Sequence, residues 1–587
     1  MKVVSDGFKE VMTQNIRPTS QFQASLEMID RSVETDATVG TSIPMGFSSG
    51  VFDKVHEGDY AAFEEDFFRV GSGQRILPDE GYIKNGYVSS TMCNADGVFE
   101  GVKVPIIEFS FADTRSFIAM TYEFAYDYPT KIRVTYYLDE GADEVVRGQF
   151  VTEPTGTSFV DGDNHIGECN RVRFEFLSMS APNRRLRVAR MVFGYEKKFE
   201  MKDILSVNHT LSIDPISSSL PYEKLVLKVG NFDKDYNPDN PNGTWEFFAN
   251  GQPLSIHYGM QIDDRIEWVE AGKLLLSDAP TVDADSASFE AVDTISTLTN
   301  DYNKGLWRDS GITLYDLAVD VLNDAGLTAT RYRLSDSLKS IGTHAPLPIL
   351  PHRECLQMIA NAGKCVLYTD TQGVIVMEDQ IHEETPIDYH IDFTKVFAKP
   401  VVKKTEKLKS VDVKVHSLHA ASEMSELCKQ TGVSIGGKKT IQVMYDAATD
   451  VEAVVDGGEL VKATYYAYTA FLEISAESTV DITVSGRAIK DDTSVVSAGG
   501  SGSGEVCPLD NPLITDADHA KIVGDWVATY LESRNTYDMS FRQDFTLDVN
   551  DVVYIRSDFE DNIPARITKL QFKLPGQQGA VSVRRVR

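Results

Sequence analysis

Residues 220–259 constrain the fold of this chain more than any other segment. They read LPYEKLVLKVGNFDKDYNPDNPNGTWEFFANGQPLSIHYG. Leu225, Leu227 and Val229 lie at every second position, which is the period of a β-strand. Residues 231–243 are rich in Asn, Asp, Pro and Gly, which form backbone turns. The segment therefore predicts strands joined by ordered loops, and it contains no catalytic pattern.

The chain is too long for a single hydrophobic core. Its 587 residues predict roughly four domains, at about 150 residues each. The contents of 42% hydrophobic and 25% charged residues are typical of globular protein. No apolar run of about 18 residues occurs, and the start MKVVSDGFKEVM lacks the apolar core of a signal peptide. We therefore expect no membrane segment and a protein made soluble in the cytoplasm of its cell.

The 6 cysteines are scattered and form no C-x-x-C pair. Cys355 and Cys365 lie among apolar residues. The pattern favours buried free thiols; a disulfide framework or a zinc site is the alternative.

Most of the chain predicts strands, and the helices gather in two places. Alternating residues at 117–124, 131–138, 171–176 and 186–193 indicate an antiparallel β-sandwich over residues 46–196. One helix is predicted where apolar residues recur on one face, at Leu314, Leu317, Ala318, Val321 and Leu322. A second helix is predicted from Pro351 to Gly363, followed by a hairpin at 365–377, and a third from about residue 516 to 533.

Several segments, taken in order, resemble landmarks of tail proteins from phages and prophages of Gram-positive hosts. They read YAAFEEDFFRVGSG, GYVSS, RLRVARMVFG, residues 220–259, TLYDLAVDVLNDAGL and CLQMIANAGKCVLYTDTQGVIVMED. Residues 511–555 resemble the final tube domain of a baseplate hub, and 46–196 resemble a galactose-binding-like jelly roll. The chain is thus similar to the tail-tip or baseplate hub family of tailed bacteriophages, with an inserted jelly-roll domain.

This resemblance implies a mainly β, multi-domain α+β fold with β-barrel-like tube domains. The expected segments are N-terminal strands joining the hub at 1–45, the jelly-roll β-sandwich at 46–196, a first tube-like domain at 197–300, an α+β domain at 301–395, a β-rich domain at 396–510 with a flexible loop at 497–504, and a second tube-like domain at 511–587. The two β regions on either side of the helices are expected to be wall pieces of a ring.

The resemblance also implies a function and its partners. We expect a structural virion protein, without catalysis or cofactor, that forms a homotrimer at the distal end of the tail tube. The trimer would adapt sixfold tube symmetry to a threefold tip and dock distal tail, tape measure, fibre or spike proteins. One alternative is a receptor-binding protein whose jelly roll grips a host cell-wall glycan; a tail-associated hydrolase is the other, which the lack of a catalytic constellation disfavours.

The net charge of −31 argues against a nucleic-acid-binding surface. It is the charge of an ordinary solvated exterior, and it would also suit a tube lumen through which DNA slides, because an acidic wall repels phosphate.

Four short patterns are candidates for chemistry. Gly46 to Gly50 match G-x-S-x-G but lack the strand and helix of a nucleophile elbow, so a turn is expected. Two acidic loops are weak calcium candidates: Asp233, Asp235, Asn237 and Asp239, and Asp161 with Asp163. A glycan platform could use Tyr126, Tyr128 and Tyr137, although strand aromatics usually fill a core. His352 and His390 are expected to stand alone, with no acid/base partner.

Overall fold

The computed structural model describes residues 1–14, 16–44, 51, 86–140, 143–240, 243–307, 310–381, 385–500, 503–533 and 535–586. The chain is mainly β, as predicted, and consists of several sheets with a few helices. It divides into two compact units. Unit 1 comprises Met1–Ala24, Phe199–Phe232 and Pro253–Arg587, and unit 2 comprises Ser25–Lys198 and Asp233–Gln252.

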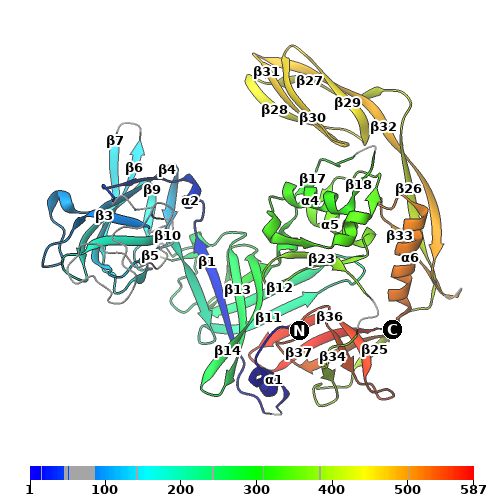
Figure 1. Ribbon diagram of the computed structural model, residues 1–587, viewed down its shortest axis with the longest axis horizontal. Helices are drawn as coiled ribbons and strands as arrows, with labels where there is room; N and C mark the ends of the chain where they lie inside the picture. Colours follow the sequence, from blue (N-terminus) through cyan, green and yellow to red (C-terminus); the bar gives the residue numbers. More distant parts are fainter. Residues whose placement is uncertain are drawn as a thin grey trace, which may run out of the picture. The chain divides into compact units, whose positions relative to one another are not determined.

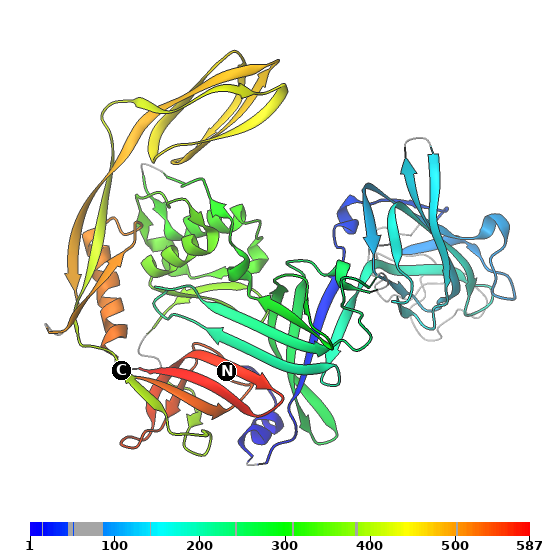
Figure 2. The ribbon, with the colours of Figure 1, turned by 180° about the vertical axis from the view of Figure 1, so that it is seen from behind.

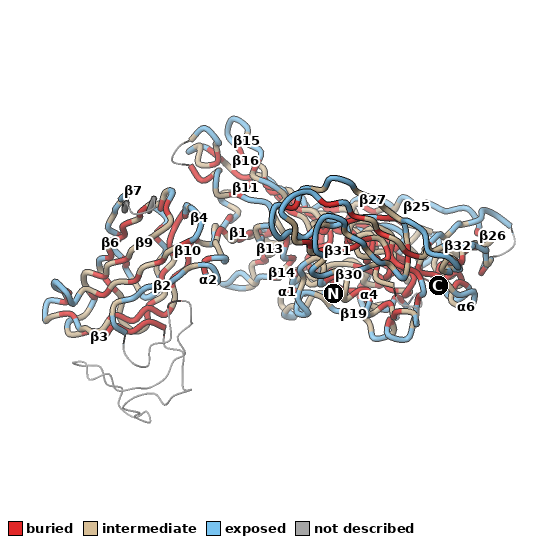
Figure 3. Tube along the Cα trace, turned by 90° about the horizontal axis from the view of Figure 1, so that it is seen from above, coloured by how far each residue is buried: buried red, intermediate tan, exposed pale blue. Residues whose placement is uncertain are grey.

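Unit 2 is a sandwich of two antiparallel sheets. The first sheet has the order β2 (Thr38–Thr41), β4 (Ile106–Phe117), β9 (Ile166–Met179), β6 (Pro129–Glu140) and β7 (Asp143–Thr152). The second consists of β3 (Tyr87–Met92), β10 (Arg185–Glu200), β5 (Met120–Phe124) and β8 (Ser158–Asp161), with the short helices α2 (Val33–Asp36) and η1 (Gly101–Lys103) outside the sheets. Buried residues alternate along β9 and cluster on β10 (Figure 3).

Aromatic side chains fill the space between the two sheets. Phe109 and Phe174 of the first sheet meet Phe193 of the second at ring centroid distances of 4.8 and 6.1 Å. All three rings are buried, and their planes are steeply inclined, an arrangement aromatic pairs prefer. The sequence prediction of an antiparallel sandwich here is confirmed for the described residues.

Residues Asp233–Gln252 belong to unit 2, although the sequence suggested one domain over 197–300. They include η2 (Trp245–Phe247). Lys197 Nζ lies 3.5 Å from Asp235 Oδ2, and the Phe247 ring stacks edge-on against His165 at 5.7 Å. These contacts attach the long loop to the sandwich.

One large sheet dominates unit 1. Its strands pair in the order β25 (Val401–Lys404), β34 (Asn535–Arg542), β37 (Gln578–Arg585), β36 (Ile563–Leu574), β11 (Ile204–Ser212), β12 (Tyr222–Gly230), β16 (Ser286–Val292), β14 (Arg265–Leu276) and β13 (Pro253–Ile262). Shorter or flanking strands are β1 (Gln21–Ile29), β15 (Thr281–Val282), β24 (His390–Ile391) and β35 (Val552–Ile555).

The β11–β36 pairing joins the two β regions that flank the central helices. Val207 to Ser212 run antiparallel to Lys569 to Leu574 (Figures 1 and 2). The predicted strand around Leu225 is β12, with Leu225, Leu227 and Val229 all buried. The two regions are therefore parts of one sheet.

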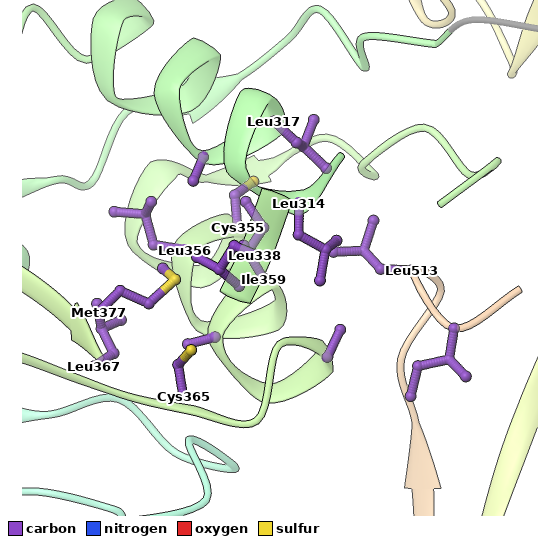
Figure 4. Close-up of a cluster of buried hydrophobic side chains, with 14 of the residues drawn as sticks. Leu314, Leu317, Leu338, Cys355, Leu356, Ile359, Cys365, Leu367, Met377 and Leu513 are labelled. Atoms are coloured by element: carbon purple, nitrogen blue, oxygen red, sulfur yellow. The ribbon is translucent and has the colours of Figure 1, made fainter. Parts of the chain in front are cut away.

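A helical layer forms the second core of unit 1. It contains α3 (Thr294–Thr297), α4 (Leu314–Asp324), α5 (His352–Ala362), η3 (Ala329–Arg331), η4 (Asp336–Ser340) and the short strands β17 (Asp301–Tyr302), β18 (Ile312–Thr313), β19 (Tyr332–Leu334), β20 (Gly342–Thr343), β21 (Leu350–Pro351), β22 (Cys365–Thr369) and β23 (Ile375–Asp379). Figure 4 shows Leu314 and Leu317 of α4, Leu356 and Ile359 of α5, and Met377 of β23 in one buried cluster. The predicted helices and hairpin are confirmed.

A long ribbon leads from this layer to a small second sandwich. β32 (Thr479–Ala498) pairs with β26 (Leu408–Ala420) in its second half and with β27 (Ser425–Ser434) and β29 (Ala448–Asp456) in its first (Figure 1). The remaining strands are β28 (Gly437–Met444), β30 (Glu459–Tyr465), β31 (Thr469–Ala476) and β33 (Glu505–Asp510). The predicted helix α6 (Ala517–Glu532) contacts β26 and β32, and its N-cap is Asp516.

The first element of the chain is a helix, and the strands that the sequence suggested over 1–45 follow it as β1 and β2. Helix α1 (Asp6–Thr13) begins at Ser5, whose hydroxyl accepts a hydrogen bond from the Phe8 amide. Phe8 and Met12, four residues apart, bury its apolar side. In the part of the chain that the structure describes, no helix is long and apolar enough to span a bilayer.

Candidate functional site

The first acidic loop is held by its own hydrogen bonds. Thr244 Oγ1 donates to Asp235 Oδ2 at 3.1 Å, and the Asp235 amide lies 3.3 Å from Asp233 Oδ1. The described residues contain no group of three or more His, Cys, Asp or Glu that could hold a metal ion. Calcium binding stays a prediction for the loop residues Asp233, Asp235, Asn237 and Asp239.

The second acidic loop contains a buried carboxylate. Asp161 is 4% exposed; its Oδ1 accepts from Asn164 Nδ2 at 2.9 Å, while its Oδ2 has no hydrogen-bond partner. The hydroxyl of Tyr122 is also buried and unpaired, and burial together with the charge of Asp161 raises the pKa of Tyr122. Metal binding by Asp161 and Asp163 likewise stays a prediction.

The predicted glycan platform is largely used inside the sandwich. Tyr137 is 8% exposed, and the Arg171 guanidinium lies 4.1 Å from its ring centroid. Tyr128 packs against the aromatic core, and Tyr126 occupies a turn with φ of 67°. Tyr137 is thus buried, whereas Tyr126 and Tyr128 are partly exposed, and glycan binding by these residues stays a prediction.

All six cysteines are free thiols; four are buried, as predicted, whereas Cys428 and Cys507 are partly exposed. The structure describes all of them, and none is in a disulfide. Burial raises the pKa of Cys169 and of Cys355 to about 12, so neither thiol carries the charge that a nucleophile needs. The G-x-S-x-G match at 46–50 and the resemblance landmark at 60–73 lie outside the described residues.

The expectation that His352 stands alone is wrong. Its Nε2 lies 2.9 Å from Asp324 Oδ2, and its Nδ1 lies 2.5 Å from the carbonyl oxygen of Asn300. Lys304 Nζ lies 2.6 Å from the other carboxylate oxygen of Asp324. His390 does not stand alone either: it stacks on Tyr554 at 4.9 Å, and its Nε2 lies 3.6 Å from Asp388 Oδ1. The His352 network links α4 to the start of α5 and is structural.

A buried histidine cluster at the centre of the large sheet escaped the sequence analysis. His209 Nε2 lies 2.9 Å from Glu223 Oε1, and Nδ1 lies 3.1 Å from the Tyr258 hydroxyl. A Cβ at Gly272 would lie 2.8 Å from Glu223 Oε1, so the bare glycine backbone makes room for the carboxyl group. Each residue looks ordinary in an alternating strand, because only cross-strand pairing brings them together.

The cluster is buried, and burial favours the neutral forms of both Glu223 and His209. Burial raises the pKa of Glu223 to about 8 and lowers the pKa of His209 to about 3. A protonated Glu223 therefore donates to Nε2 of a neutral ring, and Nδ1–H donates to the Tyr258 oxygen. Since all three residues are buried, the cluster orders the sheet and is not arranged to meet a substrate.

A second overlooked feature is the exposed strand at one end of the large sheet. Every residue of β25 is exposed, with Val401 at 60% and Val402 at 53%, and Phe397 just before it at 56%. Among the described residues, β25 pairs with β34 on one side and with no strand on the other. The sequence signal was a local run of lysines in an acidic chain: Lys395, Lys399, Lys403, Lys404, Lys407, Lys409 and Lys414.

No protein-family model matches the chain, and no curated protein matches it. Among solved structures, the chain is similar to the 43 kDa tail protein of prophage MuSo2 from Shewanella oneidensis, with 13% identity and a TM-score of 0.36 over 66% of this chain and 95% of that one. A tail protein from Neisseria meningitidis gives 8% identity and a TM-score of 0.38 over 67% and 94%. Prophage tail protein gp18 from Listeria monocytogenes gives 9% and 0.36 over 66% and 91%. Such scores do not establish a shared fold.

Proposed function

We propose that this protein is a structural component of a phage-type tail, in which several copies close into a ring at the distal end of the tail tube. The observation that carries the proposal is the single sheet that runs through both β regions and ends at the exposed strand β25. The sequence landmarks suggested a hub of this kind from the residues alone. Tail proteins occur among the compared structures, whose low scores add no weight.

An exposed, unpaired edge strand is a liability in a protein that works as a single copy. Its free N–H and C=O groups and exposed valines invite pairing with another strand. Closing a sheet on itself, or on copies of itself, removes such edges. The open sheet of unit 1 is therefore suited to be one segment of a wall that is completed by neighbouring copies.

The proposed assembly is a homotrimer of the kind found in tail hubs of phages of Gram-positive hosts. In such a trimer, the two β regions of each copy would present a pseudo-sixfold face to the tube and a threefold face to the tip. Its neighbours would be the tail tube, tape measure, fibre or spike proteins, and its place the virion. The net charge of −31 would keep DNA from adhering to the passage.

In this role the chain acts as a structural scaffold and catalyses no reaction. In the sequence analysis, unit 2 was also a candidate for binding a cell-wall glycan. The internal use of Tyr137 and Tyr128 gives that alternative no support from the structure.

The test is the oligomeric state and its symmetry. Mass photometry of the purified chain, alone and mixed with the tail tube protein from the same genome, should show a trimer. Two-dimensional electron microscopy classes of that species should show threefold symmetry around an axial passage. A chain that remains monomeric in both samples, or that forms a twofold dimer without a passage, would contradict the proposal.

A further inference from the structure

The exposed strand β25 is basic, and its outer edge has no strand partner among the described residues. Lys399 and Lys403 make ion pairs with Asp558 at 2.8 Å and Asp538 at 2.6 Å, with lysine side chains 72% and 69% exposed. Further lysines follow at 404, 407 and 409, and these have no ion-pair partner among the described residues. In a chain with a net charge of −31, residues 399–409 carry five lysines and one acidic residue, Glu406, and so form a local positive segment that begins on β25 and continues beyond it.

A hollow of about 700 Å³ lies next to this edge. Phe397, Arg542 and Lys573 line it, together with the turn at 575–579. Phe397 is held to β34 by a hydrogen bond from its amide to the Ser540 carbonyl at 2.9 Å, while its ring is 56% exposed. The segment from Phe397 to Lys404 thus offers an exposed strand edge, an apolar ring and positive charge.

A second strand edge in unit 1, that of β14, carries carboxylates and apolar side chains that could complement the lysines of β25. The hairpin of β13 and β14 turns at Asp263 and Asp264, both exposed. Beyond the turn, Ile266 and Trp268 are 39% and 40% exposed. In the described chain, the side of β14 away from β13 meets a strand only at its end, where Leu275 and Leu276 pair with β16.

The bare backbone of the partner strand fixes the tryptophan of this hairpin. A Cβ at Gly259 would lie 2.8 Å from the Trp268 ring, so the indole lies flat over the glycine. Glu267, between the two exposed apolar residues, accepts hydrogen bonds from the Ser5 amide and hydroxyl at 2.9 and 2.5 Å, which ties the hairpin to helix α1. The hairpin edge is therefore a preformed apolar surface whose turn carries Asp263 and Asp264 next to the exposed Arg265.

We propose that the free edge of β14 in one copy of this chain pairs with the free edge of β25 in the next copy. Main-chain hydrogen bonds would extend the large sheet from copy to copy. In an antiparallel pairing with Ile266 opposite Val402, Asp264 would face Lys404, and Trp268 would lie towards Phe397 and the hollow. This inference rests on the proposed ring, and it names the seam that closes it.

Two different patches that recognise each other make a head-to-tail contact. Such a contact forms a ring when the rotation closes, whereas a single self-complementary patch would give a twofold dimer. The charges on the two edges have opposite signs, which fixes the partner and the register more than it adds affinity. The occupant of each edge is therefore another copy of the same chain.

Charge reversal tests the seam. Lys404→Glu with Lys407→Glu, and separately Asp263→Lys with Asp264→Lys, should each weaken association at least about tenfold in mass photometry, because like charges then face each other. The chain carrying all four changes should recover the oligomer. Lys429→Glu on β27 with Lys439→Glu on β28, two exposed lysines on other strands, is the matched control and should leave association unchanged. Circular dichroism verifies that each variant is folded.

A cross-link locates the contact. In an oxidised sample, a chain with Val402→Cys and Ile266→Cys should give covalent multimers on a non-reducing gel, and either change alone should give at most a dimer. If the wild-type trimer forms but survives both charge reversals and the paired cysteines do not cross-link, this inference fails while the ring stands. If the wild-type chain is monomeric even with the tube protein, the ring fails, and the seam with it.

Discussion

Two histidines in unit 1 use both ring nitrogens in hydrogen bonds, yet their surroundings give them different chemistry. His209 and its partner Glu223 are buried in the large sheet, with side-chain exposures of 0% and 9%. His416, on the ribbon, lies between Asp491 at 2.7 Å and Asp510 at 2.8 Å, whose side chains are 37% and 60% exposed.

The two histidine sites differ in how far water can still reach the partner side chains. Desolvation removes the charges of the His209 pair, because neither group keeps water to stabilise an ion. Asp510 is partly buried, which opposes ionisation, but hydrogen bonds from Lys414 and His416 hold its pKa below the usual range. Both ring nitrogens of His416 face carboxylate oxygens, so its partners are charged groups, whereas the partners of His209 are neutral.

Removal of the Glu223 carboxyl group should lower the stability of the fold more than any other change considered below. Glu223→Ala leaves Nε2 of His209 without a donor and opens a cavity, and we expect it to lower the free energy of unfolding by about 3 kcal/mol or more. Glu223→Gln is the control, since its amide can still donate to Nε2 and should retain most of that stability. Urea unfolding followed by circular dichroism measures both; equal losses for the two variants would contradict a hydrogen-bonded role.

Alkaline pH should break the neutral pair. The pKa of Glu223 is raised by folding, so its contribution is fully present below the unfolded-state pKa and is lost as pH rises through about 8. Wild type should therefore lose stability relative to Glu223→Gln, by a few kcal/mol at most, from about pH 5 to about pH 9. Urea midpoints of the two chains across this range test it, and a constant difference would show that Glu223 is ionised in the fold.

Much of the fold could be predicted because its signals are local. The apolar stripe of α4, including Leu317 and Val321, and the alternation of Leu225 and Leu227 in β12 each specify one buried face within a few residues. Helix α1 was missed although Phe8 and Met12 carry the helical spacing, because its polar sequence hides so short a stripe.

The buried cluster and the free edges could not be predicted from local sequence. His209 meets Glu223 and Tyr258 only after three strands have paired, and β11 meets β36 across most of the chain. The pairing that leaves β25 at the end of the sheet is likewise long-range. A run of lysines was visible, but its meaning depends on which strand edge remains open.

His416→Ala should have a smaller and more local effect than Glu223→Ala. It removes two charge-assisted hydrogen bonds between half-exposed groups, for which we expect a loss of about 1–2 kcal/mol. The loss should be confined to the ribbon, because His416 joins β26 to β32 and β33. Hydrogen exchange should show faster amides in β33 and unchanged amides in β11; faster exchange in both would mean that the two sites are coupled.

The smallest expected effect is that of salt, which should weaken the His416 site and leave the His209 site unchanged. At 1 M NaCl the Debye length falls to about 3 Å, so interactions between partly exposed ions are strongly screened. A buried neutral pair is almost unaffected. The stability difference between wild type and His416→Ala should fall by about 0.5 kcal/mol between low salt and 1 M NaCl, which is within the range measured for exposed ion pairs. The difference between wild type and Glu223→Ala should stay the same. Hydrogen exchange of β33 and β11 amides at the two salt concentrations measures both stability differences. If salt instead reduces the difference for Glu223→Ala, the buried pair carries charge. Solvent exposure would then not explain how the two histidines differ.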